Sequence, residues 1–445
     1  MGQLAVVAFG VADTVIAGRY SDSALAALSI GAAIYISVFV SLTGIVQAFL
    51  PIWAEMLGAG RHPAVGQSLR QSLYLAALIS MVGTAALLFP APLLRWAQVP
   101  DSMLSEVTNY LAVLALAFVP SLLFRLYSTF NQSLGKPLLV TWLQLGALAI
   151  KIPLSIWLVA GGAGIEPMGM VGCAWATLVV NYLLLAVSLV MLRTQALYRP
   201  FCIWQPLERP NWPAIYSFAR LGLPAGLAYL VEITSFTLMA LFIARLGTTA
   251  LASHQIAASV AAMLYMMPLS IAIACSARTS FWLGAARPDH AKRVVWLGFK
   301  LAASISSALA ATIFIAKENL AALYSTSPDI IALASTLLGW VALYHLADSV
   351  QAVCAFLLRC YRITIAPLVL YSVLLWGVGL YGGYVLAYKG LDSLQGVSNL
   401  APNHAPSSFW MAGALALMCV AACFMALLWR AVGTSQKCVR QVPEP

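Results

Sequence analysis

The sequence predicts an all-α polytopic membrane protein, with twelve transmembrane helices arranged as two pseudo-symmetric lobes of six helices each. Composition is the first reason. Of the 445 residues, 62% are hydrophobic and only 9% are charged, whereas a soluble domain has about half apolar and a quarter charged residues. The second reason is that the apolar residues gather in helix-length runs, and the third is a resemblance between the two halves of the chain.

Twelve apolar runs are long enough to cross a bilayer, which takes about 20 residues of helix. They lie at residues 1–18, 28–54, 69–94, 107–128, 137–160, 168–192, 221–244, 250–277, 294–316, 331–358, 364–388 and 407–429. The linkers between these runs alternate in charge. The outer linkers carry few basic residues, namely Arg19, Arg95, Arg245, Lys317 and Lys389.

Nearly all other Lys and Arg residues fall in the cytoplasmic linkers and tail when the amino terminus is placed inside the cell. Basic residues concentrate on the cytoplasmic side of membrane proteins, so we expect both termini in the cytoplasm. The net charge of +10 then follows from topology, because a basic excess indicates nucleic-acid binding only where it clusters on a soluble face. The expected surroundings are a lipid bilayer and no nucleic acid.

A gapless shift of 226 residues lays one half of the chain on the other. Leu57-Gly58-Ala59-Gly60-Arg61 falls on Leu283-Gly284-Ala285-Ala286-Arg287. Because an even number of spans separates the copies, both have the same orientation in the membrane, and transporters built from such repeats usually bind substrate between them. The predicted domains are an amino-terminal lobe (1–195), a proline-rich cytoplasmic connector (196–216), a carboxy-terminal lobe (217–432) and a cytoplasmic tail (433–445).

Sequence motifs of common catalytic sites are absent. The chain has no GxxxxGK[ST] loop, no HExxH and no GxSxG, and its eight cysteines form no CxxC. A nucleotide-driven motor, a zinc protease and a serine hydrolase are therefore not expected. We predict that the protein is not an enzyme, has no catalytic residues and needs no cofactor beyond a coupling ion.

Four charged residues fall well inside the predicted spans, namely Asp13, Lys151, Glu232 and Asp348. An ionisable group at membrane depth is costly and usually marks an ion or substrate pathway. Glu232 and Asp348 both belong to the second half, so they could share an interior cavity and bind a metal cation or protons. The alternative is two unrelated helix-packing contacts.

Asp348 has polar neighbours on its own helix face. Tyr344 and His345 precede it by four and three residues, and Gln351 follows by three, a spacing that puts them beside the carboxylate. This pattern favours a buried cation or proton site over a simple packing hydrogen bond.

Asp13 and Lys151 are predicted to form an ion pair in the amino-terminal half. Each charge alone would be expensive at membrane depth, and pairing is the usual resolution for two buried opposite charges. Their positions along the first and fifth spans place them at similar depths. The alternative is a lysine side chain that reaches outward to the interface and never meets the aspartate.

Five segments in order resemble the multidrug and toxic compound extrusion family, in its bacterial NorM-like branch. They are VADTVIAGRYSDSALAALSIG, LPIWAEMLGAGR, PMGMVGCAWAT, VEITSFTLMALFIARLGTTALASHQIA and LYHLADSVQAV. The resemblance implies two six-helix lobes that form a V-shaped cleft in the bacterial inner membrane. It also implies antiport of organic cation drugs against Na⁺ or H⁺.

The resemblance also implies roles for single residues. Glu232, Asp348 and Tyr344 match the family's ion-coupling site, with the two acids as ligands if the ion is Na⁺. Asp13 matches the amino-lobe carboxylate of the proton or substrate site. This chain departs from the family there, because Lys151 and Ser155 stand where the pattern NxPLN has two asparagines.

Other interpretations remain. A flippase for lipid-linked saccharides would favour cationic groups in its cleft for an anionic pyrophosphate, whereas the spans here hold three acids and one lysine. A membrane-embedded enzyme lacks a nucleophile and base pair, and a channel lacks a repeated ring of filter residues. We expect a monomer. We also expect a native start upstream of Met1, because family members have more residues before the aspartate that matches Asp13.

Overall fold

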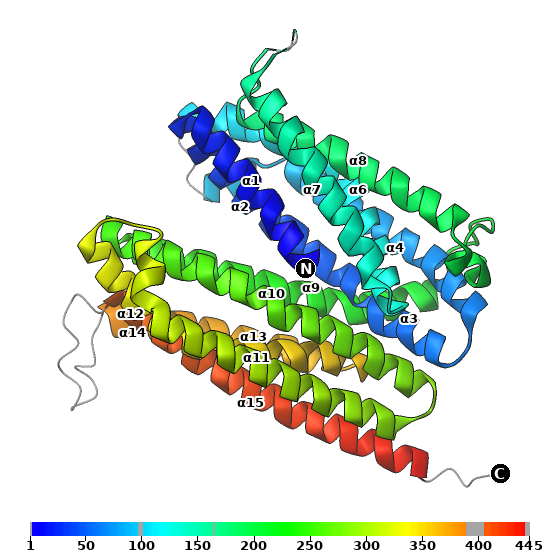
Figure 1. Ribbon diagram of the computed structural model, residues 1–445. Helices are drawn as coiled ribbons and strands as arrows, with labels where there is room; N and C mark the ends of the chain where they lie inside the picture. Colours follow the sequence, from blue (N-terminus) through cyan, green and yellow to red (C-terminus); the bar gives the residue numbers. More distant parts are fainter. Residues whose placement is uncertain (1, 97–100, 163, 165, 389–404, 441–445) are drawn as a thin grey trace, which may run out of the picture. The chain divides into compact units, whose positions relative to one another are not determined.

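The chain folds into long helices joined by short segments (Figure 1). A computed structural model describes residues 2–96, 101–162, 164, 166–388 and 405–440. The residues form two compact units, which meet along the chain between Gly226 and Leu227. Helix α9 (Trp212–Ala244) therefore gives its first part to one unit and its second part to the other.

The described helices follow one another in chain order. The first unit contains α1 (Gly2–Tyr20), α2 (Asp22–Gln47), α3 (Phe49–Gly58), α4 (His62–Leu88), α5 (Ala91–Trp96), α6 (Asp101–Ser133), α7 (Pro137–Ala160), α8 (Met170–Thr194), the 3₁₀ turn η1 (Ala196–Phe201) and the start of α9. The second unit contains the rest of α9, then α10 (Thr248–Gly284), α11 (Pro288–Ala322), α12 (Pro328–Cys360), α13 (Ile365–Ser372), the π-helical segment η2 (Val373–Tyr381), α14 (Gly382–Tyr388) and α15 (Ala405–Arg440).

Eleven described segments have the length and apolar composition of membrane spans. They correspond to eleven of the twelve predicted spans, with α2 and α3 counted together and α13 to α14 counted together. The 19-residue helix α1 covers the remaining prediction but is not among the eleven. The protein is thus a multi-pass membrane protein, and the count of twelve stays a prediction.

Four helix ends repeat the same backbone motif in the two units. Two residues after its last residue, each of these helices has a residue with positive φ. In the first unit these are Gly60 after α3 and Gly135 after α6, with φ of 70° and 71°, and in the second they are Ala286 after α10 and Arg362 after α12, with φ of 56° and 62°. In all four, the N–H of that residue bonds the carbonyl three residues back, and the next N–H bonds the carbonyl five back, at 2.9–3.1 Å. This is the Schellman motif, so the repeat predicted around Gly60 and Ala286 extends to backbone conformation.

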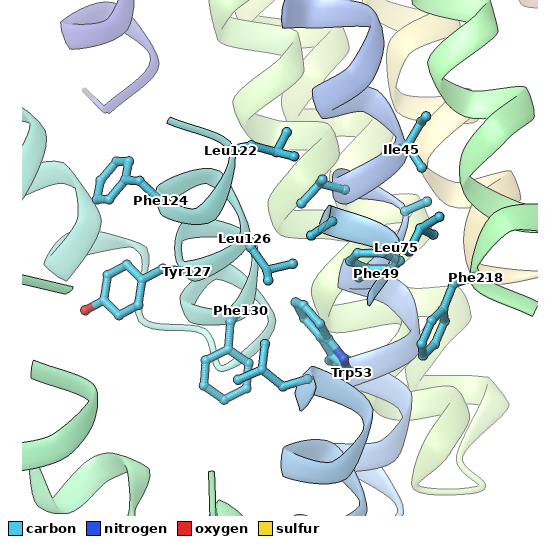
Figure 2. Packing of buried hydrophobic residues seen from close by; sticks show 14 of the residues in the cluster. Ile45, Phe49, Trp53, Leu75, Leu122, Phe124, Leu126, Tyr127, Phe130 and Phe218 are labelled. Carbon is cyan, nitrogen blue, oxygen red and sulfur yellow. The ribbon is translucent and has the colours of Figure 1, made fainter. Parts of the chain in front are cut away.

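An aromatic cluster holds the inner part of the first unit together (Figure 2). The ring of Phe49 lies 5.4 Å from Trp53 and 5.2 Å from Phe218, and Trp53 lies 5.7 Å from Phe130. Trp53 also donates its indole N–H to Ser68 at 3.0 Å, which satisfies the polar atom of a fully buried ring. Phe218 belongs to α9, so the first turns of α9 are packed into the first unit.

The connector after α8 is also fixed to the first unit. The buried guanidinium of Arg70 on α4 donates to the Cys202 carbonyl at 2.6 Å, to Gln205 at 3.2 Å and to Glu208 at 2.6 Å. The pKa of the Glu208 carboxyl is lowered, chiefly because Arg70 donates a hydrogen bond to it. This segment lies outside the spans, and its proline-rich sequence is held by side chains as well as stiffened by its prolines.

Candidate functional site

A polar network in the second unit joins the two acids that the sequence singles out. Asp348 on α12 is buried and accepts a hydrogen bond from Gln351 at 3.2 Å. The same Gln351 amide donates to the Tyr371 hydroxyl on α13 at 3.3 Å. The hydroxyl of Tyr371 in turn interacts with the carboxylate of Glu232 on α9. The structure therefore brings both acids to one network of four side chains from three helices.

Helical spacing accounts for half of this arrangement. Gln351 lies one turn after Asp348, as the sequence predicts, so its amide reaches the carboxylate along the helix. Tyr371 comes from a different helix, and its hydroxyl bridges Gln351 and Glu232. A buried charge is tolerated when it is both hydrogen-bonded and paired with an opposite charge, and here the hydrogen-bond partners of the acids are neutral.

Tyr344 and His345 lie one turn before Asp348 and have different surroundings. Tyr344 is buried and close to both acids, and its ring contacts Phe236 at 6.0 Å and Trp410 at 5.7 Å. His345 is also buried, and its Nε2 has no hydrogen-bond partner among the described residues. The predicted proximity of Tyr344 to the two acids is thus confirmed, whereas its part in ion binding stays a prediction.

The predicted ion pair of the first unit is present. The Lys151 ammonium on α7 lies 2.6 Å from Asp13 Oδ2 on α1, and both residues are buried. Lys151 also donates to the Phe9 carbonyl at 3.4 Å and lies 5.0 Å from the centre of the Phe9 ring. The ammonium is therefore enclosed by a carboxylate, a carbonyl and an aromatic face, and it does not extend outward to the interface.

Ser155 completes this site together with a residue that sequence reasoning missed. Ser155 lies one turn after Lys151 on α7 and is fully buried near the Asp13 carboxylate, but neither its hydroxyl nor Asp13 Oδ1 has a hydrogen-bond partner among the described residues. Cys173 on α8 interacts with the same carboxylate. Three helices thus converge on one acid that already has a resident cation.

The side-chain atoms near the buried acids determine which kind of ion could bind there. Within the described parts of the chain, no group of three His, Cys, Asp or Glu side chains is placed to hold a metal ion. A hard cation prefers oxygen ligands. In the second unit these would come from Glu232, Asp348, the Gln351 amide and the tyrosine hydroxyls.

Tyr371 and Tyr265 are the residues near the acids that sequence reasoning missed. Tyr265 on α10 interacts electrostatically with Glu232 and Asp348. A tyrosine inside an apolar run is a weak signal, because the same runs hold several tyrosines whose hydroxyls serve as interface anchors. Only the packing of α9, α10, α12 and α13 selects these two.

A family model described as MatE matches residues 1–157 and 224–385. The chain belongs to the MatE family. The probable multidrug resistance protein NorM of Aromatoleum aromaticum is 35% identical to this MatE protein over 431 residues, which cover 96% of this chain and 91% of the relative. Multidrug resistance protein PmpM of Pseudomonas aeruginosa is 32% identical over 387 residues, covering 87% and 81%.

Solved structures share the fold of this MatE protein. The Vibrio cholerae MATE transporter VcmN in its bent form has a TM-score of 0.81 at 16% sequence identity, covering 98% of this chain and 94% of that one. The NorM relative confirms the resemblance to the NorM-like branch that the sequence motifs indicated. The shared fold confirms the predicted fold class, and the count of twelve spans stays a prediction. The two matched blocks fall one in each half of the chain, in agreement with the internal repeat.

Proposed function

We propose that this MatE protein is a secondary antiporter that exports amphipathic organic cations in exchange for Na⁺ or H⁺. The observation that carries the proposal is the network of Glu232 and Asp348. Both acids lie at membrane depth, their bonded partners are neutral, and neither forms an ion pair among the described residues. Such acids need a proton or a cation to offset their charge.

The cycle follows from competition at these carboxylates. A coupling ion that neutralises the network lowers its affinity for a cationic drug, and a bound drug lowers its affinity for the ion. By linkage, each ligand weakens the other by the same factor. Alternating occupancy coupled to movement of the two halves would then exchange one cation for the other across the membrane.

The names of the relatives support this direction of transport. The two relatives described above are named multidrug resistance proteins, and the similar solved structure is named a transporter. We propose the same role here, in a bacterial inner membrane, for a monomer whose termini both face the cytoplasm. Catalysis is not part of the proposal, and the acids act by binding.

A flippase for lipid-linked saccharides is the alternative. It would need a free cationic group to bind a pyrophosphate. Lys151 is the cation that falls well inside a predicted span, but Asp13 already neutralises it at 2.6 Å. The ion pair therefore favours cation export over anion flipping.

Reconstituted protein would test the proposal directly. The purified chain in liposomes is given a fluorescent organic cation inside and a Na⁺ gradient or a proton gradient, imposed separately. We expect gradient-driven movement of the cation with one of the two ions. If the organic cation moved as fast without any gradient as it does with either the Na⁺ gradient or the proton gradient, antiport would be contradicted.

A further inference from the structure

Three Lys or Arg side chains are buried within the described parts of the chain, and one of them forms no ion pair there. Arg70 pairs with Glu208, and Lys151 pairs with Asp13, each at 2.6 Å. Arg359, in the last turn of α12, is 6% exposed, and its Nη1 has no hydrogen-bond partner among the described residues. A buried charge without a partner is costly, and inside a span it usually marks a function.

Two aromatic rings hold the guanidinium of Arg359 in place. Its Cζ lies 4.4 Å from the centre of the Phe356 ring, one turn earlier on α12, and 5.6 Å from the centre of the Tyr229 ring on α9. Aromatic faces attract a cation, most strongly where water is excluded, but they carry no net charge. The guanidinium is therefore fixed without being neutralised, and little of the side chain is open to a bulky anion.

The location of this charge is best described relative to the two buried acids of the second unit. Tyr229, beside the guanidinium, lies one turn before Glu232 on α9. Arg359 itself lies about three turns after Asp348 on α12. Both placements put the guanidinium on the same side of the acids, toward the start of α9 and the end of α12, and the charge pattern of the linkers predicts this side to be cytoplasmic.

Tyr265 on α10 relates the guanidinium to the acids. It interacts electrostatically with Glu232 and Asp348 and also with Arg359. The same tyrosine thus lies within the electrostatic field of the acids and of the arginine. Because Arg359 forms no ion pair with either acid, its charge does not replace the proton or cation that they need.

We propose that Arg359 is an electrostatic gate on the cytoplasmic side of the acid network. This rests on the proposed antiport and adds what prevents its coupling ion from leaking. A fixed positive charge in surroundings of low dielectric constant repels a cation that approaches it, and a pore-lining arginine excludes cations in this way. A Na⁺ ion or a proton that passed between the acids and the cytoplasm would approach the guanidinium, so the gate opposes uncoupled leakage.

Ion leakage through the reconstituted protein tests the gate. The full chain in liposomes is given a Na⁺ gradient or a proton gradient and no organic cation, and ion entry is followed with an indicator dye inside the liposomes. Arg359→Met removes the charge but keeps a long, flexible side chain against the two rings, so it should raise ion entry about tenfold. Arg359→Lys keeps the charge, so its ion entry should stay close to that of wild type.

Three comparisons separate the gate from a general loss of structure. Arg293→Met removes the same charge from the exposed surface of α11 and should leave ion entry as in wild type. Entry of glycerol, followed by light scattering, should be unchanged in Arg359→Met because a neutral solute is not repelled by a charge. Phe356→Leu removes one aromatic face but leaves the charge in place, so it should raise ion entry less, about threefold.

The outcomes distinguish the gate from the antiport. Equal ion entry in wild type and Arg359→Met overturns the gate and leaves the antiport in place, as does leakage in Arg359→Lys equal to that in Arg359→Met. A matching rise in glycerol entry also overturns the gate, because the unit would then have opened to all solutes. If Arg359→Met does not fold, unchanged ion entry in Phe356→Leu overturns the gate instead. If wild type exchanges no organic cation under either gradient while Arg359→Met alone leaks ions, the gate stands and the antiport fails.

Discussion

The two units treat their buried carboxylates differently. In the first unit, Asp13 meets the ammonium of Lys151 at 2.6 Å, so a cation is built into the chain. In the second unit, Glu232 and Asp348 share the neutral partners Gln351 and Tyr371. Asp13 is neutralised by a side chain of the same protein, so it has little need of a mobile cation. The two acids of the second unit have no such side chain among the described residues and do need a mobile cation.

This contrast suggests a division of labour between the repeats. We infer that the Asp13 site is mainly structural in this chain and that coupling depends on the second unit. The family pattern that the sequence resembles has asparagine at the position of Lys151, so that pattern does not imply a resident cation in the first unit.

Removing charge from the second unit should have the largest effect. Glu232→Gln and Asp348→Asn each keep side-chain shape but remove a negative charge, so we expect coupled cation efflux to fall to background, at least tenfold, with the protein still folded. Uptake into inverted vesicles at matched expression measures this. Glu318→Gln on the exposed surface of α11 is the control. Resistance and efflux equal to wild type in either acid variant would exclude that acid from coupling.

Breaking the pair in the first unit should mainly affect stability. Lys151→Ala leaves the buried Asp13 charge without its cation and should cost about 3–5 kcal/mol. The double variant Asp13→Asn with Lys151→Ala leaves no buried charge, so it should be more stable than Lys151→Ala alone. Thermal melting in one detergent compares wild type, Asp13→Asn, Lys151→Ala and the double variant. Losses that simply add would show that the pair contributes no coupling energy.

The sequence predicted helices well and tertiary partners poorly. Each of the twelve apolar runs coincides with helical structure, because hydropathy reports spans directly. It could not show that α9 begins at Trp212, some nine residues before the predicted 221, because polar turns outside the bilayer add no apolar signal. It also missed the break at Ala48 between α2 and α3 and the π-helical η2, which depend on local backbone geometry.

The candidate site shows the same limit. Gln351 was predictable because it lies on the same helix as Asp348, and Lys151 because an isolated buried charge requires a partner. Tyr371 reaches Glu232, and Trp410 reaches Tyr344, across helix interfaces, and their residue types occur throughout the spans. A periodic pattern specifies which face of a helix is buried but does not identify the neighbour that covers it.

The connector offers a pH-dependent comparison outside the membrane. Arg70 lowers the pKa of Glu208 below its ordinary 4.5, so this contact stabilises docking above that pH and is lost as pH falls through the lowered value. Glu208→Gln should speed amide exchange in residues 202–211 a few-fold at pH 7, a modest effect because Glu208 is about one-third exposed. As pH falls through the lowered pKa, exchange in wild type should come to match exchange in the variant after correction for intrinsic rates. A difference that did not shrink on acidification would assign the docking to other contacts.

The smallest expected effect concerns the repeated helix ends, where the units differ by one methyl group. Gly60 and Ala286 occupy the same place in the repeat with φ of 70° and 56°, but this conformation costs an alanine about 1 kcal/mol more than a glycine. Ala286→Gly should therefore raise the melting temperature by roughly 1–3 °C. Gly60→Ala should lower it by a similar amount, because a methyl group there would have nothing within 4 Å and only the backbone term would act. If both substitutions changed stability in the same direction, the two ends would not be equivalent, and packing of Ala286 in the second unit would outweigh its backbone strain.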